Sequence, residues 1–324
     1  MNPLTPAQLS KFEDEGYLVI RDFFDPATDL DPIIAEYTGV LDRLAQRLFA
    51  AGEINSTYAD ENFSERLIRI CEDTGKIHAQ SFDFSLPQRS IQADTPIWSG
   101  PAVFNLLRHP GLLDLMESLI GPEIYSNPIQ HARLKLPESR AVRDDKGEIL
   151  QGATQWHQDN GVALPEADDT DMITVWLPLW DAPIESGCLE VIPRSHRSGI
   201  IDHCPLGAAG FGIPDQLVEK QQAVSLPMVR GDVLLLHRRT CHASLPNLSN
   251  RVRWSFDLRY NPTDQPSGRD AFPGFVARSR AHPETELHDP KIWAESWLQA
   301  RATLCGNAEL QKFNRWDGTR EVCA

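Results

Sequence analysis

The feature that most constrains the fold is a series of short strand-like runs that begins at about Glu123. Pro, Gly and Asp separate each run from the next, as at the ends of strands. The runs are Ile129–Leu136, Met172–Trp180, Cys188–Ile192, Val233–His237 and Arg253–Tyr260. Because short strands with turn signals between them are typical of an all-β barrel or sandwich, we expect a β core at about residues 123–262.

The chain before this core begins with a helical pattern. Thr5 can cap a helix that Gly16 ends, and a strand-like run follows from Tyr17. Further amphipathic patterns predict helices at Asp31–Ala51, Glu61–Asp73 and Gly111–Ile120, and one after the core near Asp289–Leu304.

No repeat or low-complexity linker divides the chain, so we expect one domain over residues 1–324. It would have a helical N-terminal region at about 1–122, the β core, and a C-terminal extension at about 263–324. The expected fold class is therefore mainly β with flanking helices.

Composition narrows the classes of partner. The net charge of −15 and the pI near 5.1 argue against a surface that binds nucleic acid. No apolar stretch approaches the roughly 18–20 residues that span a bilayer, and the N-terminus has no secretory pattern. The six cysteines form no CxxC pair, which favours reduced thiols and a cytoplasmic location: Cys71, Cys188, Cys204, Cys241, Cys305 and Cys323.

His157-Gln-Asp159 is the first candidate for a metal site. Residues i and i+2 of an extended strand point to the same side, so one imidazole and one carboxylate can share a cation. This mixed nitrogen and oxygen set suits Fe(II) in a facial triad, which leaves coordination positions open. Alone, the motif has low specificity.

A second segment supplies candidates for a third metal ligand and for a residue that binds a carboxylate. A turn at Gly231-Asp232 leads into a hydrophobic strand that is followed by His237 and His242, either of which could be a third ligand. Arg253 follows His242 by eleven residues, and its guanidinium can grip a carboxylate with two parallel hydrogen bonds. Arg251 and Arg259 compete with it. Alternation along this strand puts four polar residues on one face: Arg253, Ser255, Asp257 and Arg259.

Other polar residues allow more than one interpretation. His131, Arg133 and Lys135 alternate on one strand face and could face an anionic ligand or form salt bridges. The cluster Arg194–Arg197 could contact an anionic substrate, although such clusters are more often solvated turns. Trp180 is better explained as a core residue.

The order and spacing of these elements resemble a known family over most of the chain. The residues concerned are His157-x-Asp159, Trp176, the run Ser186–His196, Gly231-Asp232 with His242-x-Ser244, Arg253, and the opening residues 4–24. The chain resembles the phytanoyl-CoA dioxygenase (PhyH) family of Fe(II)- and 2-oxoglutarate-dependent oxygenases.

The resemblance implies a double-stranded β-helix (jelly-roll, cupin-like) core that uses Fe(II), 2-oxoglutarate and O2. His157, Asp159 and His242 match the iron ligands, and Arg253 matches the arginine that binds the C5 carboxylate of 2-oxoglutarate. Ser244, Lys135 and Trp176 match positions near that cosubstrate. Family spacing favours His242 over His237 and Arg253 over its competitors. These seven residues are the expected catalytic, metal-binding and cofactor-binding set.

The implied activity is hydroxylation of a small polar or natural-product substrate, with release of succinate and CO2. Asp159 favours hydroxylation over halogenation, because related halogenases replace the acidic ligand by Gly or Ala. Desaturation, cyclisation, a dioxygenase without 2-oxoglutarate and a non-catalytic binding protein stay open. We expect the insertions Pro137–Gly152 and Ser198–Pro227 to shape substrate choice. No nucleic-acid or membrane partner is expected, and the sequence does not determine the oligomeric state.

Overall fold

A large antiparallel sheet organises the computed structural model, which describes residues 3–206 and 210–323. Its strand order is β1 (Tyr17–Ile20), β9 (Val233–His237), β4 (Ile173–Pro178), β11 (Arg253–Pro262), β2 (Glu123–Ser126) and β12 (Phe275–Ser279), and β3 (His131–Lys135) also pairs with β11. The central strand β11 is long enough to pair with β4, β3 and β2, so it connects the two halves of the sheet.

A smaller antiparallel sheet faces the large one. It consists of β10 (His242–Ser244), β5 (Leu189–Val191) and β8 (Val224–Leu226), and a separate pair is formed by β6 (Cys204–Pro205) and β7 (Phe211–Gly212). Trp176, Leu234 and Leu236 of the large sheet pack against Leu189, Val191 and Leu226 of the small one. This arrangement confirms the expected mainly β fold with a jelly-roll core.

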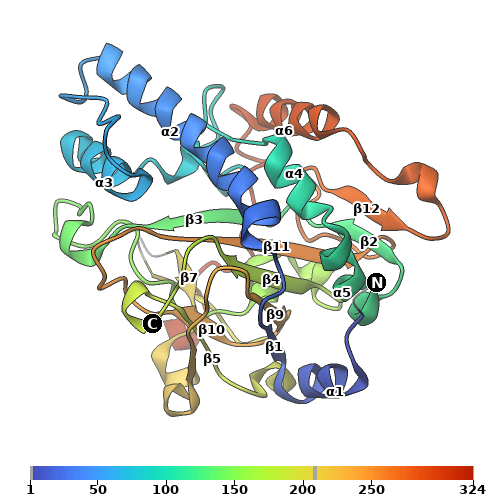
Figure 1. The fold of residues 1–324 in the computed structure, drawn as a ribbon. Coiled ribbons are helices and arrows are strands. Elements are labelled where there is room, and N and C mark those ends of the chain that lie inside the picture. The colour runs from blue at the N-terminus through green and yellow to red at the C-terminus, as the bar shows by residue number, and fades with distance from the viewer. Residues whose placement is uncertain (1–2, 207–209, 324) are drawn as a thin grey trace.

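The helices lie outside the two sheets. They are α1 (Pro6–Glu15), α2 (Asp31–Ala50), α3 (Phe63–Thr74), α4 (Pro101–Leu107), α5 (Pro110–Ile120) and α6 (Pro290–Leu304). Figure 1 shows α2, α3, α4 and α6 over the face of the large sheet that points away from β5 and β10. Thr5 caps α1 and Gly16 ends it at φ +78°, as the sequence predicts. None of the described helices is long and apolar enough to cross a membrane.

Strict alternation along β11 gives the large sheet two different faces. One set of its side chains joins the core beneath the helices: Trp254, Phe256, Leu258 and Tyr260. The intervening set points between the sheets, as predicted, and three of its members line a cavity there: Arg253, Asp257 and Arg259. Because side chains alternate across a strand, β11 stabilises the helical layer with one face and supplies polar groups with the other.

Two features differ from what the sequence predicts: the extent of the β core and the oxidation state of the cysteines. β1 and β12 belong to the large sheet although they lie outside the interval 123–262 expected for the β core. Cys204 and Cys323 form a disulfide across 119 residues, so the expectation that all six cysteines are reduced is wrong. Spacing alone did not reveal this pair, because the fold brings the two residues together. The cytoplasmic location, which rested on reduced thiols, stays a prediction.

An aromatic cluster joins the helices to β11. Trp254 is fully buried and stacks on Phe63 of α3, with ring centroids 4.9 Å apart. Trp180 meets Trp254 edge-on at 5.3 Å, in line with its expected role in the core.

We predict that Trp254→Ala lowers the free energy of unfolding by about 3–5 kcal/mol, because it removes a large side chain and leaves a cavity. Urea unfolding followed by circular dichroism measures this change. Leu298→Ala is the control, since Leu298 is an exposed apolar residue and should change stability by less than about 0.5 kcal/mol. Equal effects of the two substitutions would contradict the assigned packing.

Candidate functional site

His157 and His242 are held together by their own backbones. Each donates its N–H to the carbonyl of the other at 3.0 Å, which forms an isolated antiparallel bridge beside β10. Residues opposed in this way have their side chains on the same face. The two imidazole rings are accordingly 4.2 Å apart, centroid to centroid.

Hydrogen bonds set the orientation of both imidazoles. The Nδ1 atom of His157 lies 2.8 Å from the carbonyl oxygen of Gln155, and that of His242 lies 2.9 Å from the carbonyl oxygen of Thr240. Because a carbonyl oxygen only accepts, each Nδ1 carries the proton and each Nε2 offers a lone pair. Burial, reinforced by the neighbouring His242, lowers the pKa of His157 to about 3, so this ring is neutral at pH 7.

Asp159 completes a group of three. Its ligand atom and those of His157 and His242 all lie within 4.8 Å of one another. The sequence predicted an extended strand through His157-x-Asp159, but Asp159 begins a 3-10 turn, Asp159–Val162. The carboxylate still reaches the imidazoles, because the extended Gln158 links the bridge to the turn.

Two residues that the sequence did not assign to the group hold the Asp159 carboxylate. Thr174 Oγ1 donates to Oδ2 at 2.5 Å, and Arg259 forms an ion pair with Oδ1. Burial alone would raise the pKa of Asp159, but Arg259 and the two imidazoles hold it well below the usual range. Alternation had already placed Arg259 on the inner face, where it lines the cavity, but its ion-pair partner is Asp159.

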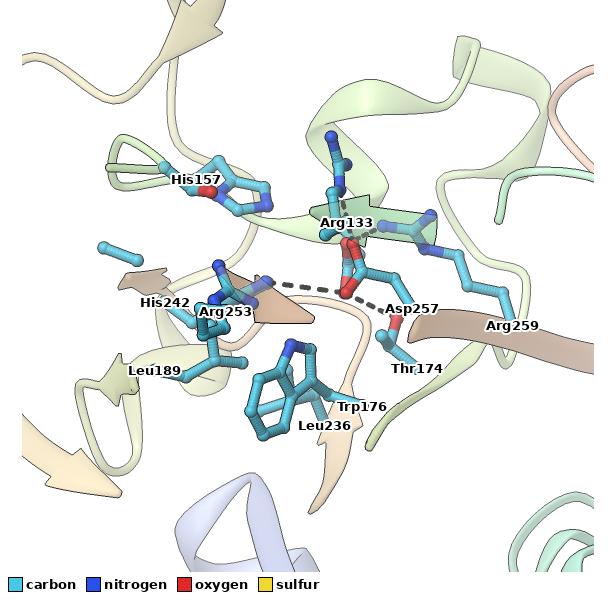
Figure 2. Close-up of a pocket in the computed structure, with 13 residues that line it drawn as sticks. Arg133, His157, Thr174, Trp176, Leu189, Leu236, His242, Arg253, Asp257 and Arg259 are labelled. Atoms are coloured by element: carbon cyan, nitrogen blue, oxygen red, sulfur yellow. Dashed lines mark hydrogen bonds and ion pairs between the residues drawn. The ribbon is translucent and has the colours of Figure 1, made fainter. Parts of the chain in front are cut away.

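Arg253 lies in the same cavity as the three clustered residues. It is buried, its Nη1 donates to Ser255 Oγ at 2.5 Å, and its guanidinium carbon is 5.8 Å from the centroid of the Trp176 ring. No carboxylate among the described residues is within ion-pair distance of it. Burial lowers the pKa of Arg253 to about 10, which leaves it charged at pH 7. Figure 2 shows Trp176, Leu189 and Leu236 gathered on one side of this cavity.

Lys135 stands directly opposite Arg253 in the register of β3 and β11. Its ammonium donates to Thr154 Oγ1 and Ser244 Oγ, each at 2.6 Å, and has no ion-pair partner in the part of the chain that the structure describes. Burial, followed by the charges of Arg253 and Arg133, lowers its pKa well below the usual range. Two buried basic side chains therefore stand opposite each other here, and an anion between them would favour the charged form of Lys135.

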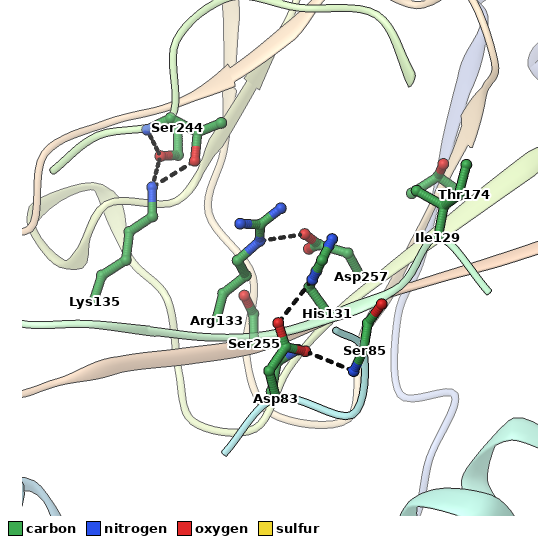
Figure 3. A network of polar contacts seen from close by, with 12 residues as sticks. Asp83, Ser85, Ile129, His131, Arg133, Lys135, Thr174, Ser244, Ser255 and Asp257 are labelled. Carbon is green, nitrogen blue, oxygen red and sulfur yellow. Dashed lines mark hydrogen bonds and ion pairs between the residues drawn. The ribbon is translucent and has the colours of Figure 1, made fainter. Parts of the chain in front are cut away.

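The other two polar residues of β3 have protein partners. His131 Nδ1 lies 2.8 Å from an Asp83 carboxylate oxygen, and Arg133 Nε donates to Asp257 at 2.8 Å. The open alternatives for this face are therefore resolved: Arg133 forms an ion pair with Asp257 and His131 a hydrogen bond with Asp83, whereas Lys135 has no carboxylate partner among the described residues. In Figure 3 the dashed contact with Asp257 starts from Nε of Arg133 and not from its terminal nitrogens, and the side chain is 37% exposed.

The structure separates the remaining candidates from this cavity. His237 contacts His196 and Phe12 instead. The Arg251 side chain is exposed, and the charged cluster binds α1 through the ion pairs Arg194–Glu15 and Arg197–Asp14.

The predicted insertion at 137–152 lines an open groove next to the cavity. The groove shares Arg133 and Thr154 with the cavity, and Arg143 and Gln151 of the insertion also line it. The insertion therefore lies where it can contact a molecule that enters the cavity. Residues 207–209 of the second insertion lie outside the described residues.

Comparisons with known proteins identify relatives across most of the chain. The family model described as Phytanoyl-CoA dioxygenase (PhyH) matches residues 12–255. A protein from Arabidopsis thaliana, named phytanoyl-CoA dioxygenase, is 25% identical over 270 residues, which cover 81% of this chain and 90% of that protein. The 1-deoxypentalenic acid 11-beta-hydroxylase of Streptomyces exfoliatus is 28% identical over 177 residues, covering 52% of this chain and 59% of the relative.

Solved structures share the fold at low identity. The apo form of the non-heme monooxygenase ThoJ superimposes with a TM-score of 0.57 and 16% identity, covering 91% of this chain and 96% of that one. The epimerase SnoN, in complex with Fe3+, alpha ketoglutarate and nogalamycin RO, gives a TM-score of 0.50 and 20% identity, covering 81% and 86%. Together with the match over residues 12–255, the fold and the three clustered residues show that the chain belongs to the phytanoyl-CoA dioxygenase (PhyH) family of Fe(II)- and 2-oxoglutarate-dependent oxygenases.

Proposed function

We propose that this protein is a hydroxylase in which His157, Asp159 and His242 bind Fe(II) and Arg253 binds the far carboxylate of 2-oxoglutarate. The observation that carries the proposal is the pair of buried basic side chains, Lys135 and Arg253, which stand opposite each other, with Arg253 lining the same cavity as the three candidate ligands. A buried cation is costly without a partner, and a dicarboxylate that chelates iron at one end brings the missing charge at the other.

The donor set fits Fe(II). Two imidazole nitrogens and one carboxylate oxygen form a two-histidine, one-carboxylate triad, which leaves coordination positions for cosubstrate and dioxygen. Arg259 and Thr174 engage both Asp159 oxygens, so the carboxylate is oriented before a metal binds. Bound Fe(II) and 2-oxoglutarate would supply dioxygen activation coupled to decarboxylation of the cosubstrate.

The residues around Arg253 fit the far end of 2-oxoglutarate. The Arg253 Nε atom is buried without a hydrogen-bond partner, so it can donate to a carboxylate. Lys135 uses two of its three protons on Thr154 and Ser244, which leaves one for the same anion. Trp176 forms an apolar wall beside the guanidinium and helps to exclude water.

We place the substrate between the iron site and the groove at 137–152. Arg133 lines both spaces, and its two terminal nitrogens have no protein partner among the described residues. The two terminal nitrogens of a guanidinium bind carboxylate or phosphate oxygens with two parallel hydrogen bonds. The substrate class that fits is therefore a small polar or natural-product molecule with an anionic group, hydroxylated at an unactivated C–H bond. The name of the Streptomyces relative, a hydroxylase of an acid, supports this choice.

We predict that Arg253→Ala lowers kcat/KM for 2-oxoglutarate by at least about 30-fold, since loss of one partner from a buried charge pair costs about 2–5 kcal/mol. Succinate release measures the change. Arg251→Ala is the matched control, because that side chain is exposed and does not line the cavity. Unchanged kinetics in Arg253→Ala would exclude this role.

A second prediction separates the two candidate third ligands. His242→Ala should reduce anaerobic Fe(II) binding by more than about 100-fold, beyond the roughly 10–100-fold loss typical of changes to outer-shell partners. His237→Ala should bind Fe(II) as the unchanged protein does, because its ring packs against His196 and Phe12. Iron content after desalting reports both. The reverse pattern would assign the third ligand to His237.

A third prediction concerns the substrate. In a panel of small carboxylic acids and their primary amides, the acids should stimulate succinate release more strongly, and Arg133→Gln should remove most of this preference. Mass spectrometry of the stimulating compound should show a gain of one oxygen. Stimulation by amides equal to that by acids would contradict an anionic substrate, and loss of two hydrogens would indicate desaturation instead.

A further inference from the structure

The turn that carries Asp159 is held by segments distant from it in the sequence. The backbone N–H of Gln158 donates to Nε2 of His203 at 3.0 Å. The Gln158 side chain donates to the carbonyls of Gly199 and Arg239 and accepts from the N–H of Ile201. Gln158 lies between two proposed iron ligands, so these contacts act on the spacing of His157 and Asp159.

His203 is itself clamped on both faces. It is fully buried, and its Nδ1 donates to the carbonyl of Ile201 at 2.8 Å, so Nε2 is the acceptor for Gln158. A Cβ atom on Gly161 would lie 2.3 Å from the His203 ring, which means that the ring presses against the backbone of the turn. On the other side it stacks on Trp316, at 5.2 Å between centroids and 21° between planes.

Trp316 belongs to a C-terminal segment, Phe313–Cys323, which we call the strap. Trp316 Nε1 donates to the carbonyl of Gly161 at 2.6 Å, so it contacts the turn directly as well as through His203. Arg315 forms a two-pronged ion pair with Asp168. Gln216 donates to the carbonyl of Val322 at 3.1 Å.

A second group fastens the beginning of the strap to the same turn. Arg269 donates to the carbonyl of Val162 at 2.7 Å, and its guanidinium carbon lies 5.4 Å from the centroid of the Phe313 ring. The far end of the strap is covalently attached, because Cys323 is bonded to Cys204, the residue next to His203. The strap is therefore tied down at both ends, with Trp316 between them.

We infer that the strap, held by the Cys204–Cys323 disulfide, positions the iron-binding turn, and that His203 is the positioning residue that transmits this constraint to Asp159. The inference rests on the proposed iron site. The matched part of the family model ends at residue 255, so the strap lies beyond it. Partners that orient metal ligands typically change metal affinity by 10–100-fold, although they do not touch the metal.

The test is an anaerobic titration of the metal-free protein with Co(II), in which the visible absorption spectrum of bound Co(II) reports binding. This measurement needs no catalytic turnover. Cys323→Ser should weaken Co(II) binding by about tenfold or more and change the spectrum, because the end of the strap is released. Cys305→Ser is the matched control: it removes a free thiol from the same region without affecting the strap. Reduction with dithiothreitol should reproduce the effect in the unchanged protein: the reagent supplies two electrons and two protons to the disulfide, becomes its own cyclic disulfide, and is removed anaerobically before Co(II) is added.

Substitutions at His203 separate positioning from general stability. His203→Ala should weaken Co(II) binding by about tenfold or more, and His203→Gln should restore part of it, since an amide oxygen can accept the Gln158 N–H. Thermal unfolding of each metal-free variant shows that it is folded at the titration temperature. Co(II) affinity and spectrum unchanged by Cys323→Ser, by dithiothreitol and by His203→Ala would overturn the inference. Failure of the unchanged protein to bind Co(II) would instead overturn the iron site on which it rests.

Discussion

The site depends on one backbone contact, the reciprocal pair of hydrogen bonds between His157 and His242. This bridge joins the segment before the turn of Asp159 to the edge of the small sheet, and it directs both imidazoles to the same face. The side-chain contacts then refine what the bridge has established: carbonyl oxygens hold each Nδ1, and Thr174 and Arg259 hold the carboxylate. A site built on paired backbones needs little reorganisation when a metal binds.

The alternation of β11 explains why charged groups can lie inside this fold. Its apolar side chains, including Trp254 and Phe256, pack beneath the helices, and this burial stabilises the layer that holds the strand. The same strand must then direct Arg253 and Arg259 between the sheets. Arg259 has a partner in Asp159, whereas Arg253 and Lys135 have none among the described carboxylates. The fold thus maintains a cationic cavity inside a chain whose net charge is −15.

Much of the fold was predictable, because local patterns report it directly. The helices α1, α2 and α3 and the strands β3, β4, β9 and β11 coincide with patterns in the sequence to within a few residues. β10 and β12 were not predicted, because pairing partners distant in sequence define them and length alone does not distinguish them from β3 and β9. The disulfide was missed for the same reason: 119 residues separate its cysteines.

The sequence by itself determined the kinds of residue available to the site and the alternation that turns Arg253 inward, because side-chain direction along a strand is a local property. Only the tertiary structure shows that His242, and not His237, lies beside His157 and Asp159, since this depends on which histidine pairs with His157. It also decided that Arg259 binds Asp159 and that His203 and Trp316 lie against the turn. These contacts join segments about 40 to 160 residues apart, and no local pattern records which distant surfaces the packing of two sheets and a strap brings together.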